Sequence, residues 1–136
     1  MKGHPEVLQP AHWPRPKGFS HGIAVRGRLL FVAGQVGWDS TGRFASERLP
    51  EQVRQALENV VAVLAEGGAR PEHVTRMVWY LTSRDEYCAS LKEIGACYRT
   101  VMGRHFPTMS VVQVVALMEQ RAKVEIEATA VIPDSD

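Results

Sequence analysis

The order of apolar patterns along the chain predicts an α+β fold, a two-layer sandwich with two helices on one face of a mixed β-sheet. Apolar residues recur at helical spacing over 50–66 and 83–102. The segments between and around them are rich in β-branched and aromatic residues or alternate with period two. The predicted order is β-β-α-β-α-β-β. With 136 residues, one domain is expected, which we place at 18–133 after a Pro-rich arm at 1–17.

The first two strands are expected to form a hairpin over residues 22–33. Ile23 and Val25 precede Arg26-Gly27, and apolar residues from Leu29 follow. Gly27 would supply the positive φ of a tight turn. A loop follows from 34 to 48.

A helix is predicted to begin at Pro50 and to end at Gly67-Gly68. A strand over 74–81 follows it. Ser83 and Glu86 have the spacing of a capping box, so a second helix should start there and run to Gly103. The apolar stripes of the two helices are Val53, Leu57, Val60 and Leu64, and Tyr87, Leu91, Ile94 and Tyr98.

Two final strands are predicted over 107–117 and 122–132. The first is apolar on both faces, and the last places Val124, Ile126, Ala128 and Ala130 on one side. Because the helices cover only one face of the sheet, an apolar face remains open. Such a face favours a second copy of the chain as its cover, so we expect a homo-oligomer.

Composition excludes several functional classes. The net charge of +1 lacks the basic excess of a nucleic-acid binder. No apolar run reaches the ~18 residues of a membrane helix, and the N-terminal segment has no signal-like core, so a cytoplasmic protein is expected. No His or Cys pair has metal-ligand spacing, and no metal site is expected. Cys88 and Cys97 are interpreted as buried, reduced, inert thiols.

A few residues remain candidates for chemistry. Gly34 allows a ligand to approach the main chain closely. Glu125 and Glu127 form either a solvated face or a site in which one carboxylate orders a water. Phe19 and Trp38 either wall a pocket or pack in the core.

Three ordered segments resemble the RidA/YjgF family, also called endoribonuclease L-PSP. They are Phe31-Val32-Ala33-Gly34-Gln35, the 52–64 helix with Gln55 and Asn59, and Phe106-Pro107-Thr108-Met109-Ser110 followed by Val124-Glu125-Ile126-Glu127-Ala128.

The resemblance implies a chorismate-mutase-like fold and a homotrimer with a ligand cleft at each subunit interface. It also implies cofactor-free hydrolysis of imines or enamines such as 2-aminoacrylate. In such members a motif Arg clamps the substrate carboxylate, and a carboxylate on the last strand lies near the attacking water. Here that carboxylate is Glu125, and the ligand-binding candidates are Phe19, Ala33, Gly34, Gln35, Met109, Ser110 and His105.

The chain departs from the family pattern. Met109 stands at the position of the Arg, Phe19 at that of a Tyr, and Ala33 at that of a Ser. We therefore expect poor deamination of ordinary 2-imino acids and a more apolar cleft, with Arg104 or His105 as a substitute cation. Three functions remain open: hydrolysis of a reactive imine or related metabolite, a non-catalytic ligand-binding or regulatory trimer, and, less favoured by the charge, a ribonuclease.

Overall fold

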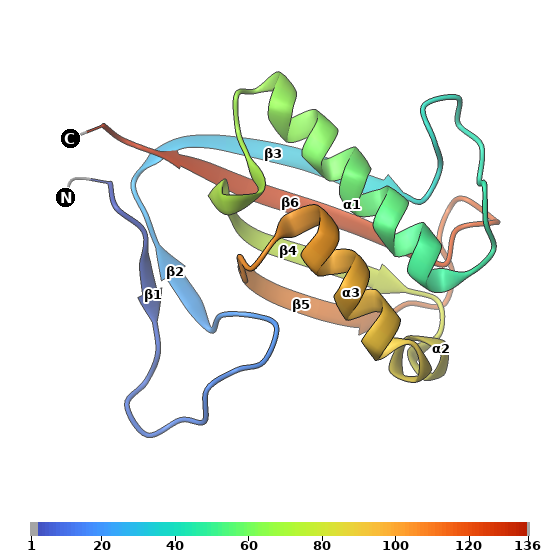
Figure 1. Cartoon of the computed structure of the whole chain (residues 1–136), viewed down its shortest axis with the longest axis horizontal. Coiled ribbons are helices and arrows are strands. Elements are labelled where there is room, and N and C mark those ends of the chain that lie inside the picture. Colours follow the sequence, from blue (N-terminus) through green and yellow to red (C-terminus); the bar gives the residue numbers. More distant parts are fainter. Residues whose placement is uncertain (1–2, 136) are drawn as a thin grey trace.

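The computed structural model describes residues 3–135, and it consists of a helix layer on one sheet plus a small two-stranded sheet (Figure 1). The elements are β1 (Glu6–Leu8), β2 (Gly22–Ala24), β3 (Gly27–Val36), α1 (Leu49–Glu66), the 3-10 turn η1 (Pro71–His73), β4 (Val74–Leu81), α2 (Arg84–Ala89), α3 (Leu91–Met102), β5 (Thr108–Gln113) and β6 (Val124–Pro133).

The main sheet has the strand order β3-β6-β4-β5, and β4 runs parallel to β5 while the other neighbours are antiparallel. Both α1 and α3 cover the same face of this sheet (Figure 1). The parallel pair arises because the chain crosses over through α2 and α3 between β4 and β5. The predicted two-layer α+β fold with a mixed sheet is confirmed.

The core lies between the helices and the covered face of the sheet. The predicted stripe of α1 is fully buried, with Val53, Leu57, Val60 and Leu64 each 0% exposed. It packs against the predicted inner face of β6, where Val124, Ile126, Ala128 and Ala130 are buried. Period 3.6 in the helix and period two in the strand therefore located the core correctly.

The predicted 22–33 hairpin is wrong. β2 pairs with β1 of the N-terminal arm, whereas β3 pairs with β6. Gly27 has no positive φ. Instead, a Cβ at Gly27 would lie 1.9 Å from the Ile132 carbonyl oxygen, so a close approach between strands, not a turn, requires glycine there.

Two other boundaries differ from the prediction. The second helix is divided at Ser90 into α2 and α3, although Ser83 caps α2 as expected by accepting a bond from Glu86 N at 3.1 Å. β5 ends at Gln113 instead of 117, and the side chain of Val115 is fully exposed. An apolar run can leave a sheet where no neighbouring strand continues to pair with it.

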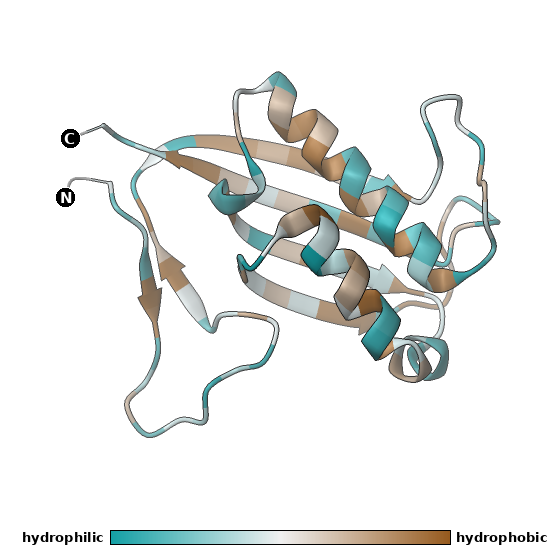
Figure 2. Cartoon of the chain, in the orientation of Figure 1, coloured by the Kyte–Doolittle hydropathy of each residue, from teal (hydrophilic) through white to brown (hydrophobic). Residues whose placement is uncertain are grey.

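The face of the sheet opposite the helices is open and mixed in character. Leu29 is 55% exposed, Phe31 75% and Val112 43%. Figure 2 shows β3 as apolar along most of its length, although the helices cover only one of its faces. Glu125 and Glu127 of β6 lie on the open face as well. Within residues 3–135 no helix combines the length and apolarity needed to cross a membrane.

Candidate functional site

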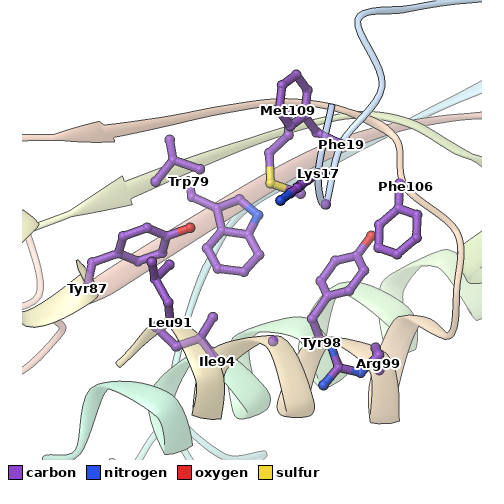
Figure 3. Close-up of a pocket in the computed structure, with 13 residues that line it drawn as sticks. Lys17, Phe19, Trp79, Tyr87, Leu91, Ile94, Tyr98, Arg99, Phe106 and Met109 are labelled. Carbon is purple, nitrogen blue, oxygen red and sulfur yellow. The ribbon is translucent and has the colours of Figure 1, made fainter. Parts of the chain in front are cut away.

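A pocket of about 470 Å³ opens between α3 and the β4–β5 edge of the sheet (Figure 3). Its floor is Trp79 of β4 with Met109 and Val111 of β5, which share the covered face of the sheet. The predicted stripe of the second helix forms one wall, through Tyr87, Leu91, Ile94 and Tyr98. Phe19 and Phe106 close the other side.

The aromatic wall is held in place by main-chain contacts. The Tyr98 hydroxyl donates to the His105 carbonyl at 2.6 Å, and its ring stacks on Phe106 with centroids 6.0 Å apart. Burial raises the pKa of Tyr98 well above its usual value, and burial also raises the pKa of Tyr87. Both hydroxyls therefore remain protonated at neutral pH.

A second group of candidate residues lies on the open face of the sheet. The register of β3 against β6 shifts between Val32 and Gln35, so Ala33 and Gly34 form a bulge. A Cβ at Gly34 would lie 2.2 Å from Oε2 of Glu125. The carboxylate of Glu125 therefore lies directly against the main chain of the bulge. Gln35 turns its amide back to donate to the Ala33 carbonyl at 3.1 Å.

These two groups occupy opposite faces of one sheet. Met109 pairs in register with Met77, whose side chain is buried under the helices, and Tyr80 pairs with Glu125. Because side chains alternate along a strand, Met109 and Glu125 point to opposite sides. The structure therefore brings Phe19 together with Met109, and Ala33, Gly34 and Gln35 together with Glu125, but within one chain it does not join the two groups.

Ser110 and His105 lie outside the main pocket. Ser110 is exposed and lines a small neighbouring cavity together with Phe19 and Thr108. The His105 ring contacts the Val74 carbonyl through Nε2 at 2.5 Å and, with Arg104, lines a separate cavity. Neither Arg104 nor His105 is therefore placed to replace the missing Arg at the pocket.

Sequence reasoning missed two cations at this pocket, Lys17 and Arg99. Lys17 belongs to the N-terminal arm, whose path no local pattern predicts. Arg99 is one helical turn after Gly95, and its Nη1 lies 3.4 Å from the place of a Cβ at position 95. That spacing is the signal that could have found Arg99.

The polar residues of the 52–64 motif serve the fold instead of a ligand. The Gln52 amide donates to the Ser46 and Arg121 carbonyls and its oxygen accepts from Lys123 N. Asn59 donates to the carbonyls of Val36 and Trp38. These bonds tie the loops at one end of the sheet to α1.

Other candidates have structural surroundings. Trp38 packs with Phe44 at 6.0 Å between ring centroids, in a small cluster apart from the pocket. The expected burial of both cysteines is wrong, because Cys88 is exposed and Cys97 is half-buried on separate helices. Within the described part of the chain, no group of three His, Cys, Asp or Glu side chains is placed to hold a metal ion.

Comparison with known proteins agrees with the fold and the motif order. A family profile described as endoribonuclease L-PSP matches residues 13–132. A RutC family protein of Pyrococcus horikoshii is 33% identical over 127 residues, 92% of this chain and 96% of its own length. The chain belongs to the RidA/YjgF family.

Other members of the RidA/YjgF family match most of the chain. Human 2-iminobutanoate/2-iminopropanoate deaminase is 28% identical over 105 residues, 76% of this chain and 73% of its own. The structure of YyfB from Yersinia pestis superposes with a TM-score of 0.81 at 32% identity, covering 94% of this chain and 98% of YyfB. E. coli TdcF with bound serine has a TM-score of 0.67 at 27% identity, covering 93% and 98%. Some RidA/YjgF members are thus named as deaminases, and one was solved with an amino acid bound.

Proposed function

We propose that this protein hydrolyses a reactive imine or enamine, without a cofactor, in a cleft formed between copies of the chain. The observation that carries the proposal is the carboxylate of Glu125, which lies against the Gly34 bulge on an open face. A positioned carboxylate can take a proton from water as the water attacks the imine carbon. The resulting carbinolamine then loses ammonia to leave a carbonyl compound. The deaminase names of relatives support this reaction class.

The cleft requires a second copy because Glu125 and the pocket lie on opposite faces of one sheet. A neighbour that laid its open face beside the pocket would bring its own Glu125 toward Met109. The exposed Phe31 and Val112 on that open face supply apolar area for such a contact. We assign a homotrimer, which gives each pocket one neighbouring open face.

The substrate of this cleft differs from a small 2-imino acid. Met109 lies among apolar and aromatic side chains at the position where the family pattern has an Arg. A thioether donates no hydrogen bond to a carboxylate. The same observation favours a second candidate, a trimer that binds an apolar ligand without turnover. Only the family name supports a ribonuclease, and the net charge of +1 argues against binding to RNA.

The test is release of ammonia from freshly generated 2-aminoacrylate, 2-iminobutanoate and imines of bulkier 2-oxo acids. We expect hydrolysis of at least one bulky imine and a loss of about 100-fold or more in Glu125→Gln, the scale of one general base. Glu127→Gln is the matched control on the same strand face and should keep its activity. Equal catalysed rates for wild type and Glu125→Gln on every imine would refute the role of Glu125. Rates no faster than uncatalysed hydrolysis for both would leave the binding protein.

Mixed subunits test the shared cleft. Glu125→Gln removes the carboxylate, and Leu91→Trp fills the pocket from α3, where Leu91 is 51% exposed. If the cleft is shared, trimers re-formed from equal amounts of both variants contain about a quarter of clefts with two intact sides, because the partners combine at random. Recovery of activity to that level supports the proposal. No recovery after subunit exchange, verified by mass spectrometry, would contradict a shared cleft.

A further inference from the structure

The indole N–H of Trp79 is a buried donor without a protein acceptor. Trp79 is 2% exposed, and its Nε1 is the one buried side-chain nitrogen or oxygen among the described residues that lacks a hydrogen-bond partner. An unpaired buried donor is unfavourable, so it points to an acceptor supplied from outside the chain. Figure 3 shows this nitrogen directed into the pocket, away from Tyr87.

Two unpaired cations line the same pocket. Neither Lys17 nor Arg99 makes an ion pair within residues 3–135, although Arg48, Arg54 and Arg70 each pair with a glutamate. The guanidinium of Arg99 lies beside Gly95, with Nη1 3.4 Å from the place of a Cβ there. Figure 3 shows Arg99 at α3, on the opposite side of the pocket from Lys17, so one carboxylate does not reach both cations. Lys17 lies on the side of Met109 and the Trp79 indole nitrogen, where its ammonium offers a carboxylate a charge-assisted partner.

The remaining surfaces of the pocket are apolar and too extensive for a short-chain acid. Phe19, Tyr98 and Phe106 supply aromatic faces, and the cavity of about 470 Å³ has the size of a drug-like ligand site. A two-carbon or three-carbon acid would leave most of these faces in contact with water. An aromatic ring would remove them from water and stack on them.

We propose that this pocket selects a 2-oxo or 2-imino monocarboxylate with an aromatic or similarly bulky apolar side chain. The carboxylate pairs with Lys17, the carbonyl oxygen or imine nitrogen accepts from Trp79 Nε1, and the side chain lies among the aromatic residues toward α3. This inference rests on the proposed function for its reaction and narrows the substrate class. Lys17 thereby supplies, from the N-terminal arm, the charge that Met109 does not carry.

Binding of phenylpyruvate, measured by titration calorimetry on the full chain, tests the inference, with pyruvate as the small control ligand. Phenylpyruvate should bind at least about tenfold more tightly than pyruvate, because only its ring covers the apolar faces. Trp79→Phe keeps a ring but loses the donor, and should weaken binding about three- to tenfold. Lys17→Gln should weaken it about tenfold, whereas Arg54→Gln, an exposed α1 control, should not.

The nuclear magnetic resonance signal of the Trp79 indole N–H reports on ligand binding directly, because a purely structural role of Trp79 would not change it when ligand is added. This signal, assigned by its loss in Trp79→Phe, should shift when phenylpyruvate is added, while the Trp38 signal should stay. Equal affinity for both acids, an unchanged Trp79 signal or unaffected variants would overturn the inference. Imine hydrolysis that depends on Glu125 would then still stand. Conversely, the expected binding without hydrolysis of any imine would refute the proposed function and keep this ligand class.

Discussion

The carboxylate of Glu125 occupies the space that a side chain at position 34 would need. Oε2 of Glu125 lies 2.2 Å from the place of a Cβ on Gly34, and its Cδ lies 2.7 Å from that place. No real Cβ could share that space, so the carboxylate holds this position only while residue 34 is glycine. Gly34 is exposed and its φ is not positive, so this contact, and not the backbone conformation, is what a side chain there would disturb.

Gly34→Ala should displace the carboxylate of Glu125 while the fold remains. We expect imine hydrolysis to fall about tenfold to 100-fold, because a misplaced base loses its alignment with the water. Ammonia release and the melting temperature are the two measurements. Glu125→Asp in the Gly34→Ala background retracts the carboxylate and should recover part of the activity. If Gly34→Ala keeps full activity, Glu125 is not held at the bulge for catalysis.

Gln52 should be one of the most sensitive polar positions of the fold. It is 1% exposed and bonds three main-chain groups, from Ser46, Arg121 and Lys123. Gln52→Leu leaves these groups unpaired, so the free energy of unfolding should fall by about 2–4 kcal/mol. Urea unfolding measures the loss. Gln55→Leu on the same helix breaks one side-chain bond, to Asn59, and should cost less than about 1 kcal/mol.

The sequence predicted the features of the fold that follow from a periodic pattern of apolar residues within a single helix or strand. The stripe of α1 and the alternation of β6 follow from local geometry, and both are confirmed. The partner of β2 and the end of β5 depend on which segment lies alongside, which local patterns do not specify. The prediction correctly singled out Gly27 as a position that needs glycine, but it assigned this need to a hairpin turn. In the structure the need comes from the close contact with the neighbouring strand.

The sequence predicted several residues of the candidate site, but not how they are arranged on the sheet. The motifs led to Met109 and to Glu125, but not to their placement on opposite faces, because that depends on which strand pairs with which. Lys17 and Arg99 were missed because the pocket joins an N-terminal arm to α3. Trp79 was recognised only as a residue of an apolar strand, since its unpaired N–H is a property of the packed structure.

Stability should fall at alkaline pH through Tyr98. Burial raises the pKa of its hydroxyl above the ordinary 10.0. A raised pKa in the folded state stabilises the fold below about pH 10, and that contribution is lost as the pH rises above it. The free energy of unfolding of wild type, measured in urea, should therefore fall toward that of Tyr98→Phe between about pH 9 and pH 11.5. Phe106→Leu disturbs the stacked ring but removes no titrating group, so its difference from wild type in free energy of unfolding should stay constant with pH. A constant difference between wild type and Tyr98→Phe would contradict the prediction.

Phe31 should mark the contact between copies of the chain. Its side chain is 75% exposed on the open face, so Phe31→Glu should leave each subunit folded but break a contact made there. We expect light scattering after size-exclusion chromatography to give a trimer for wild type and smaller species for Phe31→Glu. Val63→Glu places the same charge on α1, at a residue that is 41% exposed, and should remain trimeric. A stable wild-type monomer would refute the trimer and the shared cleft together.

Met109→Arg should change which acids the pocket prefers. The half-buried thioether lines the pocket beside Trp79, so a guanidinium there would add a donor for a carboxylate at a position that now carries none. Charge-assisted bonds contribute about 1.5–3 kcal/mol each, so pyruvate should bind roughly tenfold more tightly. Phenylpyruvate should gain less, because the longer Arg side chain takes up space needed by the ring. Turnover need not rise, since Phe19 and Ala33 still lack hydroxyl groups.

Calorimetric titration of both acids measures this shift in preference. Met118→Arg, at a side chain that is 98% exposed, adds the same charge outside the pocket and should leave both affinities unchanged. Equal gains for Met109→Arg and Met118→Arg would show that net charge, not the pocket, attracts the acids. A loss of pyruvate affinity in a folded Met109→Arg protein would mean that position 109 does not face the bound carboxylate. The ratio of pyruvate affinity to phenylpyruvate affinity in each variant is thus the quantity that separates a contact in the pocket from a general attraction by charge.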